Sequence, residues 1–273
     1  ELEEAPSPAV SAQAGVFSAV YASGTSAGHA LCFDESALYE DAAVDLRRVD
    51  GVKAGAGAAL PMGGGLLFET EAGIAWAPTS DAPRAPTPMR ECASVGARAG
   101  LGGLALVQCD GALLRFESSD GTPSASTVNL PFELEAGTEL ALHPEGSAVA
   151  VYGPSGAWAV PLQAGVAAPT PLTTPARVCD LGFEPGHGVT ITALTEAGVL
   201  YQLDAQSGVV LHERAVAEPF ACSDAPRPTL AQAPARAYVA LPGARRIDEL
   251  WLDDALAPLG SYPLSLAPAR IHV

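Results

Sequence analysis

Short apolar runs separated by tight turns recur along the chain and dominate its pattern of hydrophobic and polar positions. One unit, made of an apolar run, a Gly-containing turn and a second apolar run, reads GLLFETEAGIAWA over residues 65–77 and GLALVQCDGALLRFE over 103–117. It returns as AVAVYGPSGAWAV over 148–160 and VTITALTEAGVLYQLD over 189–204. Such runs around a Gly turn are typical of β-hairpins, and no segment keeps a helical period. The pattern therefore predicts an all-β protein.

Weaker copies of the unit over residues 16–34 and 237–253 bring the predicted hairpins to six. The turn glycines of the four clear copies, 38, 45 and 42 residues apart, are Gly73, Gly111, Gly156 and Gly198. This spacing is typical of the four-stranded blades of a β-propeller. We therefore predict a single propeller of six blades, with seven as the alternative.

A further short apolar strand precedes several hairpins, at residues 140–142, 178–183 and 230–233, and is predicted to be the inner strand of its blade. Residues 266–273 resemble one more inner strand with no hairpin after it, whereas the first hairpin has no inner strand before it. Pairing these N- and C-terminal strands would close the ring and remove free sheet edges.

Residues 1–14 are rich in Ala, Pro, Ser and Glu and have no periodicity, so we expect a flexible tether there and the propeller over 15–273. Such a tether is typical of a secreted protein or lipoprotein that has lost its signal peptide, and a lipid anchor through it is one expectation. The apolar runs fall far short of the roughly 20 residues of a membrane-spanning helix, so no transmembrane segment is expected.

Acidic residues outnumber basic ones by 31 to 14, which gives a formal net charge of −17. This argues against nucleic acid as a partner, because phosphate binding needs clustered cations. An acidic surface favours solubility, and the alternative is that it attracts metal cations or basic partners.

Enzyme motifs are nearly absent from the sequence. Residues 24–28, GTSAG, match the nucleophile-elbow pattern, but they lie between two predicted strands, where that motif needs a strand-to-helix turn. There is no P-loop, dinucleotide fingerprint, His-Glu-x-x-His or EF-hand loop. We therefore assign no catalytic residue.

Basic side chains stand at the starts of presumed inner strands, and they are Arg90, Arg177, Arg227, Arg270 and, in a fifth blade, Lys53. In that register they would ring one mouth of the central channel. One interpretation is a site for an anion or carboxylate, because Arg offers a rigid bidentate fork. The other is structural, with each cation bridging to acids and carbonyls of neighbouring blades.

The five cysteines are Cys32, Cys92, Cys109, Cys179 and Cys222, so at least one stays unpaired if the others form bridges. Cys92 and Cys109 fall on neighbouring antiparallel strands, and Cys179 and Cys222 fall near the junction of the last two full blades. Two disulfides are therefore predicted for an oxidising compartment, with Cys32 as a buried free thiol.

A zinc site is the alternative for some of these residues. Cys92, Cys179 and His272 each follow an arginine by two residues, and thiolate and imidazole both suit zinc. The remaining histidines, at positions 29, 143, 187 and 212, have no ligand spacing, and we expect exposed turn residues there.

Two stretches resemble a known family. Residues 91–100 followed by 106–114, LVQCDGALL, look like the two-cysteine segment of the AztD-type periplasmic zinc-chaperone propellers. Residues 226–239, 247–250 and 267–271 look similar to that family's last blade and C-terminal end. The resemblance as a whole runs from about Ala54 onward.

The resemblance implies a periplasmic or surface location, a disulfide between Cys92 and Cys109, and a role in handing zinc to the binding protein of a transporter. The family carries histidine-rich stretches, including a histidine soon after the first cysteine. Here that place reads Ser94-Val95-Gly96-Ala97, and the chain has no histidine cluster, so no zinc ligand is assigned.

The sequence thus predicts a non-catalytic, extracytoplasmic propeller that binds a protein partner or a small anionic ligand, or serves as a scaffold, without a cofactor. The first alternative is a periplasmic zinc-binding chaperone of AztD type. The second is a propeller-type hydrolase or lyase that uses the arginines and acids of the channel mouth.

Overall fold

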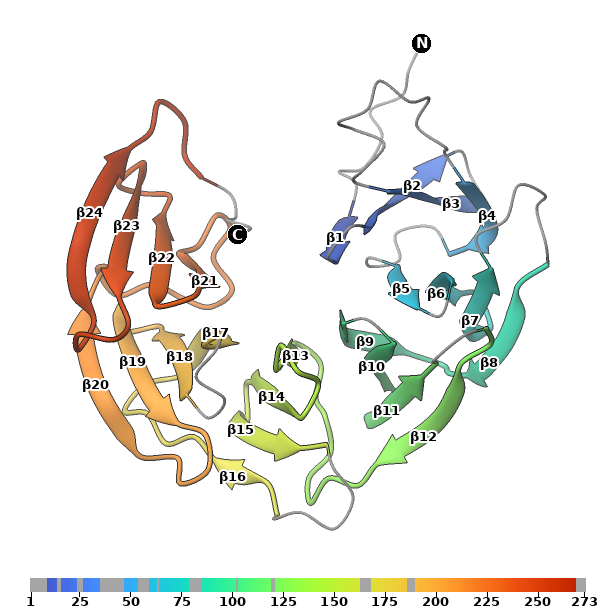
Figure 1. Ribbon diagram of the computed structural model, residues 1–273, viewed down its shortest axis with the longest axis horizontal. Helices are drawn as coiled ribbons and strands as arrows, with labels where there is room; N and C mark the ends of the chain where they lie inside the picture. Colours follow the sequence, from blue (N-terminus) through green and yellow to red (C-terminus); the bar gives the residue numbers. More distant parts are fainter. Residues whose placement is uncertain are drawn as a thin grey trace. The chain divides into compact units, whose positions relative to one another are not determined.

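The computed structural model describes residues 9–13, 16–23, 27–34, 47–53, 59–62, 64–78, 85–101, 103–118, 121–162, 168–185 and 190–268, with side chains from residue 51 onward. Within these ranges the regular structure is entirely β (Figure 1). No helix there is long and apolar enough to cross a membrane. The chain divides into two compact units, Glu1–Leu134 and Glu135–Val273, which are described separately.

The first unit contains three four-stranded antiparallel sheets, each with its strands in chain order. The first sheet is β1 (Ala9–Gln13), β2 (Val16–Ser23), β3 (Ala27–Asp34) and β4 (Arg47–Val52). The second is β5 (Leu60–Met62), β6 (Gly65–Thr70), β7 (Gly73–Pro78) and β8 (Thr87–Glu91). The third is β9 (Val95–Leu101), β10 (Leu104–Cys109), β11 (Ala112–Glu117) and β12 (Ser124–Val128).

The second unit repeats this plan in three further sheets. They are β13 (Glu139–Leu142), β14 (Ala148–Gly153), β15 (Gly156–Pro161) and β16 (Thr170–Pro171); β17 (Val178–Phe183), β18 (Thr190–Thr195), β19 (Val199–Asp204) and β20 (Val210–Ala215); and β21 (Thr229–Ala233), β22 (Arg236–Leu241), β23 (Arg246–Trp251) and β24 (Ala257–Pro263). All six predicted hairpins are confirmed as the middle two strands of these sheets, and the repeated meander is consistent with a propeller.

The turns and the core explain why the hairpin pattern is so regular. Asp110 (φ 49°) and Gly111 (φ 80°) both adopt a positive φ, as the two central residues of a type I′ hairpin turn require. Along β18, Ile191 belongs to the core shared with the β13–β16 sheet, whereas Leu194 belongs to the core shared with the β21–β24 sheet. Because both faces of such a middle strand are buried, it reads as a continuous apolar run.

The structure corrects the predicted tether and does not show the predicted closure of the ring. Residues 9–13, inside the range expected for the tether, form β1 and pair with residues 16–20 of β2. The alternating segment AVSAQ directly precedes the hairpin, so its backbone can add to the open edge of β2. The first sheet therefore takes four strands from residues 9–52 without the C-terminal segment. Residues 266–268 form no strand, and 269–273 lie outside the described residues.

Candidate functional site

Arg227, two residues before β21, is the best anchored of the predicted channel-mouth cations. Its Nη2 donates to Oε1 of Glu139 at 2.7 Å, and its Nη1 donates to the backbone carbonyl of Cys222. Burial alone would lower the pKa of this guanidinium, but the hydrogen bond and charge of Glu139 raise it above the usual value. The side chain therefore bridges two segments of the unit, which matches the structural interpretation.

A buried polar cluster continues from this ion pair. The Tyr152 hydroxyl lies 3.2 Å from Oε2 of Glu139 and 3.4 Å from Oδ1 of Asp180. Asp180 accepts the backbone N–H groups of Leu181 at 2.9 Å and Leu230 at 2.8 Å. Burial, together with the charges of Asp180 and Glu139, holds the pKa of Tyr152 well above 10, so the phenol remains a donor. The cluster links β13, β17 and β21, the first strands of their sheets.

The other predicted cations do not join this cluster among the described residues. Arg177 directly precedes β17, as expected, and is exposed. Arg90 is also exposed, but it lies in β8, the fourth strand of its sheet and not the first, so its predicted position is wrong. The reason is that the Pro-containing segment TPMRE forms an edge strand, where a missing N–H is tolerated.

Lys53 and Arg98 bind one buried carboxylate in the first unit. Nζ of Lys53 donates to Oε1 of Glu69 at 2.7 Å, and Nη2 of Arg98 donates to Oε2 at 2.8 Å. The hydrogen bond with Glu69 raises the pKa of Lys53. Arg270 lies outside the described residues, so its place at a channel mouth remains a prediction, whereas the predicted ring loses Arg90.

Both predicted disulfides are present. Cys92 is bonded to Cys109, with 5.5 Å between the Cα atoms, and Cys179 to Cys222, with 4.9 Å. Their sulfurs are therefore not thiolate ligands, and the zinc alternative built on Cys92 and Cys179 is wrong. His272 and the side chain of Cys32 lie outside what the structure describes.

The described histidines differ from each other. His212 is exposed, as expected, but it lies in β20 and not in a turn. His143 is only 3% exposed, so the prediction of an exposed residue is wrong for it. Its Nδ1 accepts the N–H of Glu145 at 3.1 Å, and its ring packs edge-on against Phe183. The tight turn after β13 folds the ring back onto the neighbouring sheet. In the described part of the chain, no three His, Cys, Asp or Glu residues are grouped closely enough to hold a metal.

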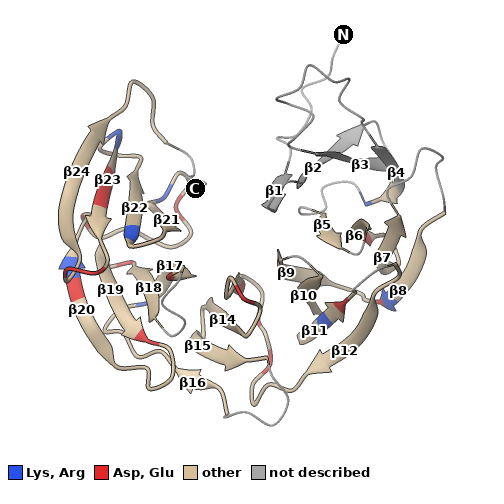
Figure 2. Cartoon of the chain, viewed as in Figure 1, with Lys and Arg blue, Asp and Glu red and all other residues tan. Residues whose placement is uncertain are grey.

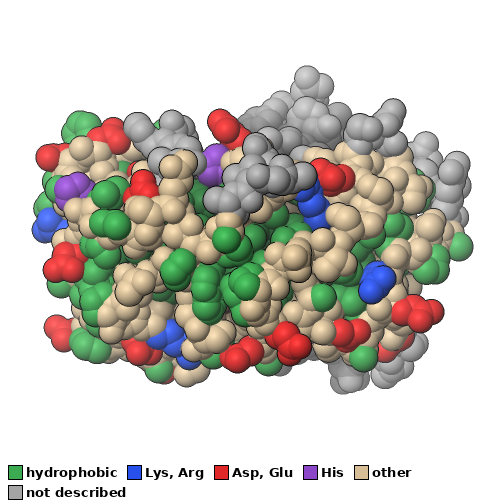
Figure 3. Space-filling model, turned by 90° about the horizontal axis from the view of Figure 1, so that it is seen from below, with side chains coloured by type: hydrophobic (Ala, Val, Ile, Leu, Met, Phe, Trp, Pro, Cys, Tyr) green, Lys and Arg blue, Asp and Glu red, His purple; other side chains and the backbone are tan. Residues whose placement is uncertain are grey.

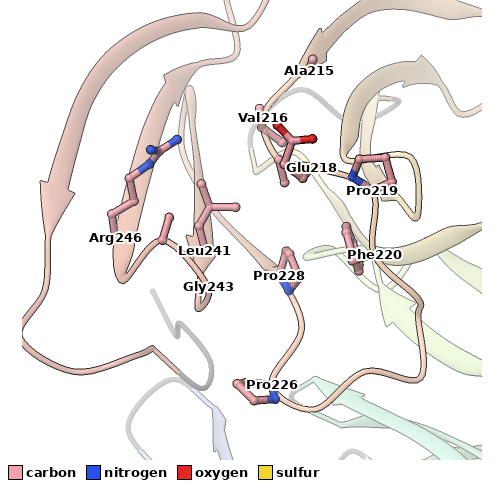
Figure 4. A pocket seen from close by; sticks show the side chains of 12 residues that line it. Ala215, Val216, Glu218, Pro219, Phe220, Pro226, Pro228, Leu241, Gly243 and Arg246 are labelled. Atoms are coloured by element: carbon pink, nitrogen blue, oxygen red, sulfur yellow. The ribbon is translucent and has the colours of Figure 1, made fainter.

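A pocket of about 680 Å³ in the second unit was not predicted from the sequence. One wall is the connection between β20 and β21, and the other is the turn between β22 and β23 (Figure 4). Its apolar lining includes Val216, Pro219, Phe220, Pro228 and Leu241. Pocket volumes of roughly 300–1,000 Å³ are typical of ligand sites. Two Pro-containing segments of the connection between β20 and β21, PF and PRP, are the sequence feature that could have suggested this pocket.

Charge is distributed unevenly over the described side chains. Acidic positions are spread over the face that Figure 3 presents, whereas basic positions are few. The connection that lines the pocket carries Glu218, and the opposite wall carries Arg246. The pocket therefore combines an apolar lining with charged groups, as binding sites for amphipathic groups do.

Comparisons with known proteins identify the fold. No family model and no curated protein matches the sequence. Among solved structures, apo AztD from Citrobacter koseri is similar, with a TM-score of 0.75 and 18% identity over 96% of this chain and 73% of that one. A second AztD structure from the same organism gives 0.76, with 19% identity over 96% and 72%. Kluyveromyces lactis Hsv2 gives 0.68, with 12% identity over 97% and 88%. The chain has an AztD-like propeller fold.

Proposed function

We propose that the chain is an extracytoplasmic, six-bladed β-propeller that acts by binding rather than by catalysis. The observation that carries this proposal is the similarity to AztD structures over 96% of the chain. Two disulfides support an oxidising compartment, because such bonds are rare in reducing cytosol. The six four-stranded sheets support the number of blades.

Zinc handling of AztD type is the function that the fold favours. The net charge of −17 would attract a divalent cation and raise its concentration near the surface. Both disulfides leave four of the five cysteines unavailable, and the described residues hold no group of three metal ligands, so imidazole and carboxylate groups, or the thiolate of Cys32, would have to supply the ligands from other parts of the chain.

Calorimetric titration of zinc into chelator-treated, disulfide-intact protein tests this function. We expect saturable binding of a defined number of zinc ions with a dissociation constant below about 1 μM, and no comparable heat from magnesium, which prefers all-oxygen sites. Absence of saturable heat would exclude zinc as the cargo.

Binding of a protein partner is the second candidate function, and the pocket beside β22 favours it. An apolar hollow of about 680 Å³ lies in a chain whose other described apolar side chains mostly fill the cores between sheets. Affinity capture with the wild-type protein and a pocket variant, Phe220→Ser, tests this candidate. We expect a partner that the wild type retains and the variant loses, and equal retention by both would contradict it.

A further inference from the structure

The pocket beside β22 continues into a second hollow, and together they form what we call the β20–β23 groove. The second hollow has a volume of about 520 Å³ and is lined from β20, β23 and β24. Both hollows share Ala215, Val216 and Arg246, so they adjoin each other. The groove is therefore elongated, with an apolar half at the β20–β21 connection and a polar half between β20 and β24.

Two arginines supply the unused hydrogen-bond donors of the polar half. Arg214 makes one hydrogen bond among the described residues, from Nη1 to the carbonyl of Leu256 at 3.3 Å, and no described carboxylate lies within ion-pair distance of it. Arg246 donates Nε and Nη2 to Asp248 at 3.0–3.2 Å, which leaves its Nη1 without a described partner. The basic positions on β20 and at the start of β23 stand out in Figure 2, because the described chain carries few such residues.

The two acids of the polar half already have donors. Asp248 accepts from Arg246 and from the Ser261 hydroxyl at 2.7 Å. Glu249 is 5% exposed and accepts from Arg236 at 2.6 Å, from the Tyr238 hydroxyl at 3.2 Å and from the Tyr262 hydroxyl at 2.5 Å. These hydrogen bonds, chiefly the one from Tyr262, lower the pKa of Glu249. Its carboxylate therefore stays ionised, and its oxygens already have donors. The capacity left for a ligand is cationic and suits a carboxylate.

The apolar half, which also contains the carboxylate of Glu218, suits a hydrocarbon side chain. Figure 4 shows Phe220, Pro228 and Leu241 pointing into the hollow, with Arg246 at its edge. Leu259 of β24, which lines the polar half, is 42% exposed and adds apolar surface there. An occupant that fills the whole groove must therefore be extended and must carry an apolar group some distance from a carboxylate. β20 and β24, which flank the groove, are both edge strands.

We propose that the β20–β23 groove binds an extended segment of a partner protein, with an apolar side chain in the hollow of Phe220 and Leu241 and a carboxylate between Arg214 and Arg246. This proposal rests on the second candidate function, partner binding, and is independent of zinc. The length of the two joined hollows favours a polypeptide over a small acid, because a small acid would fill only one of them.

Selection from a displayed library of end-blocked dodecapeptides, on immobilised disulfide-intact protein in the presence of EDTA, tests the proposal. We expect enrichment of sequences that combine Asp or Glu with an apolar residue a few positions away. Affinities of one selected peptide are then measured by fluorescence anisotropy. The double variant Arg214→Gln/Arg246→Gln should bind it about tenfold more weakly, the scale of a charged hydrogen bond. Arg115→Gln, at an arginine of the first unit that pairs with Glu117 and lies outside the groove, should bind it normally.

A double-mutant cycle assigns the contact to these groups. Replacing the acid of the peptide with its amide should weaken wild-type binding about tenfold and should cause little further loss in the double variant. Octanoate, a small acid with an apolar tail, should displace the peptide only weakly.

Three results would overturn the proposal: no enrichment of acidic-apolar sequences, equal affinity of wild type and double variant, or displacement by octanoate as effective as by unlabelled peptide. Because the selection is done in EDTA, these results do not depend on zinc binding. Failure of the zinc titration leaves the peptide result standing, and the reverse also holds.

Discussion

Arg227 and Arg214 belong to the same unit and differ in how their guanidinium groups are occupied. Arg227 holds Glu139 at 2.7 Å and the carbonyl of Cys222, next to the buried Tyr152 and Asp180. Among the residues that the structure describes, Arg214 makes one long hydrogen bond of 3.3 Å, to a carbonyl, and it lines a hollow. Arg227 therefore acts as a structural bridge, whereas Arg214 keeps donors for a ligand.

This difference shows what decides between structure and binding in a chain with few cations. The position of an arginine at the start of a strand does not reveal its role. Arg177 and Arg227 both stand at such starts, and of these two only Arg227 has a side-chain bridge to a carboxylate among the described residues. The two roles are separated by how many N–H donors of the guanidinium already have acceptors. A guanidinium whose donors are all bonded within the protein has few left for a partner.

Loss of the Cys179–Cys222 disulfide should cause the largest decrease in the free energy of unfolding. The bridge spans 43 residues and fixes the connection that carries Arg227, so Cys179→Ser/Cys222→Ser should lower the free energy of unfolding by about 4 kcal/mol in urea titrations. Binding of the selected peptide should also fall, because this connection forms one wall of the groove.

The second disulfide is the matched control for that measurement. Cys92→Ser/Cys109→Ser opens a span of 17 residues in the first unit and should cost about 3 kcal/mol while peptide affinity is retained. Equal loss of peptide affinity in both double variants would contradict the local role of Cys179–Cys222.

Asp180→Asn should have the next largest effect. The carboxylate accepts the N–H groups of Leu181 and Leu230, and an amide group would place a donor against one of them. We expect a loss of about 2 kcal/mol in unfolding free energy. Asp224→Asn, at an exposed acid that accepts the N–H of Ala221, should stay within about 0.5 kcal/mol of wild type. A similar loss in both variants would contradict the importance of the buried cluster.

The smallest predicted effect is on the loss of unfolding free energy at acidic pH. Because hydrogen bonds lower the folded-state pKa of Glu249 below 4.5, its stabilising contribution is present above that pH and is lost as the pH falls through the lowered value. Tyr262→Phe removes the 2.5 Å donor and should reduce this loss in urea titrations between pH 7 and 3. If the unfolding free energy of Tyr262→Phe falls between pH 7 and 3 as steeply as that of the wild type, Tyr262 does not hold Glu249 in the ionised form.

Much of the fold could be predicted from the sequence, because Gly turns and apolar runs encode hairpins locally. The pairing of Cys92 with Cys109 was predicted and is confirmed, but Cys92 lies in the connection between β8 and β9 and not on the strand beside Cys109, which pairs with Val95 of β9. β1 was not predicted, since its five residues, AVSAQ, include one strongly apolar side chain. Its position depends on backbone pairing with β2, which composition does not encode.

The candidate site was harder to predict. Arg227 stood where expected, but its acceptor Glu139 lies 88 positions away along the chain and meets it only through sheet packing. The groove brings together the β20–β21 connection and the β22–β23 turn, so neither segment alone indicates a hollow. Local patterns specify hairpins, whereas the groove results from the way two hairpin sheets pack.

The most direct test compares Arg214→Gln and Arg227→Gln in one experiment, with urea unfolding and peptide anisotropy measured on both. Arg214→Gln should keep its unfolding free energy within about 0.5 kcal/mol of wild type and bind the selected peptide several-fold more weakly. Arg227→Gln should lose about 1–2 kcal/mol, discounted for its partial exposure, because Glu139 and the Cys222 carbonyl lose their donor. An Arg214→Gln protein that is as destabilised as Arg227→Gln and binds the peptide like wild type would contradict the account.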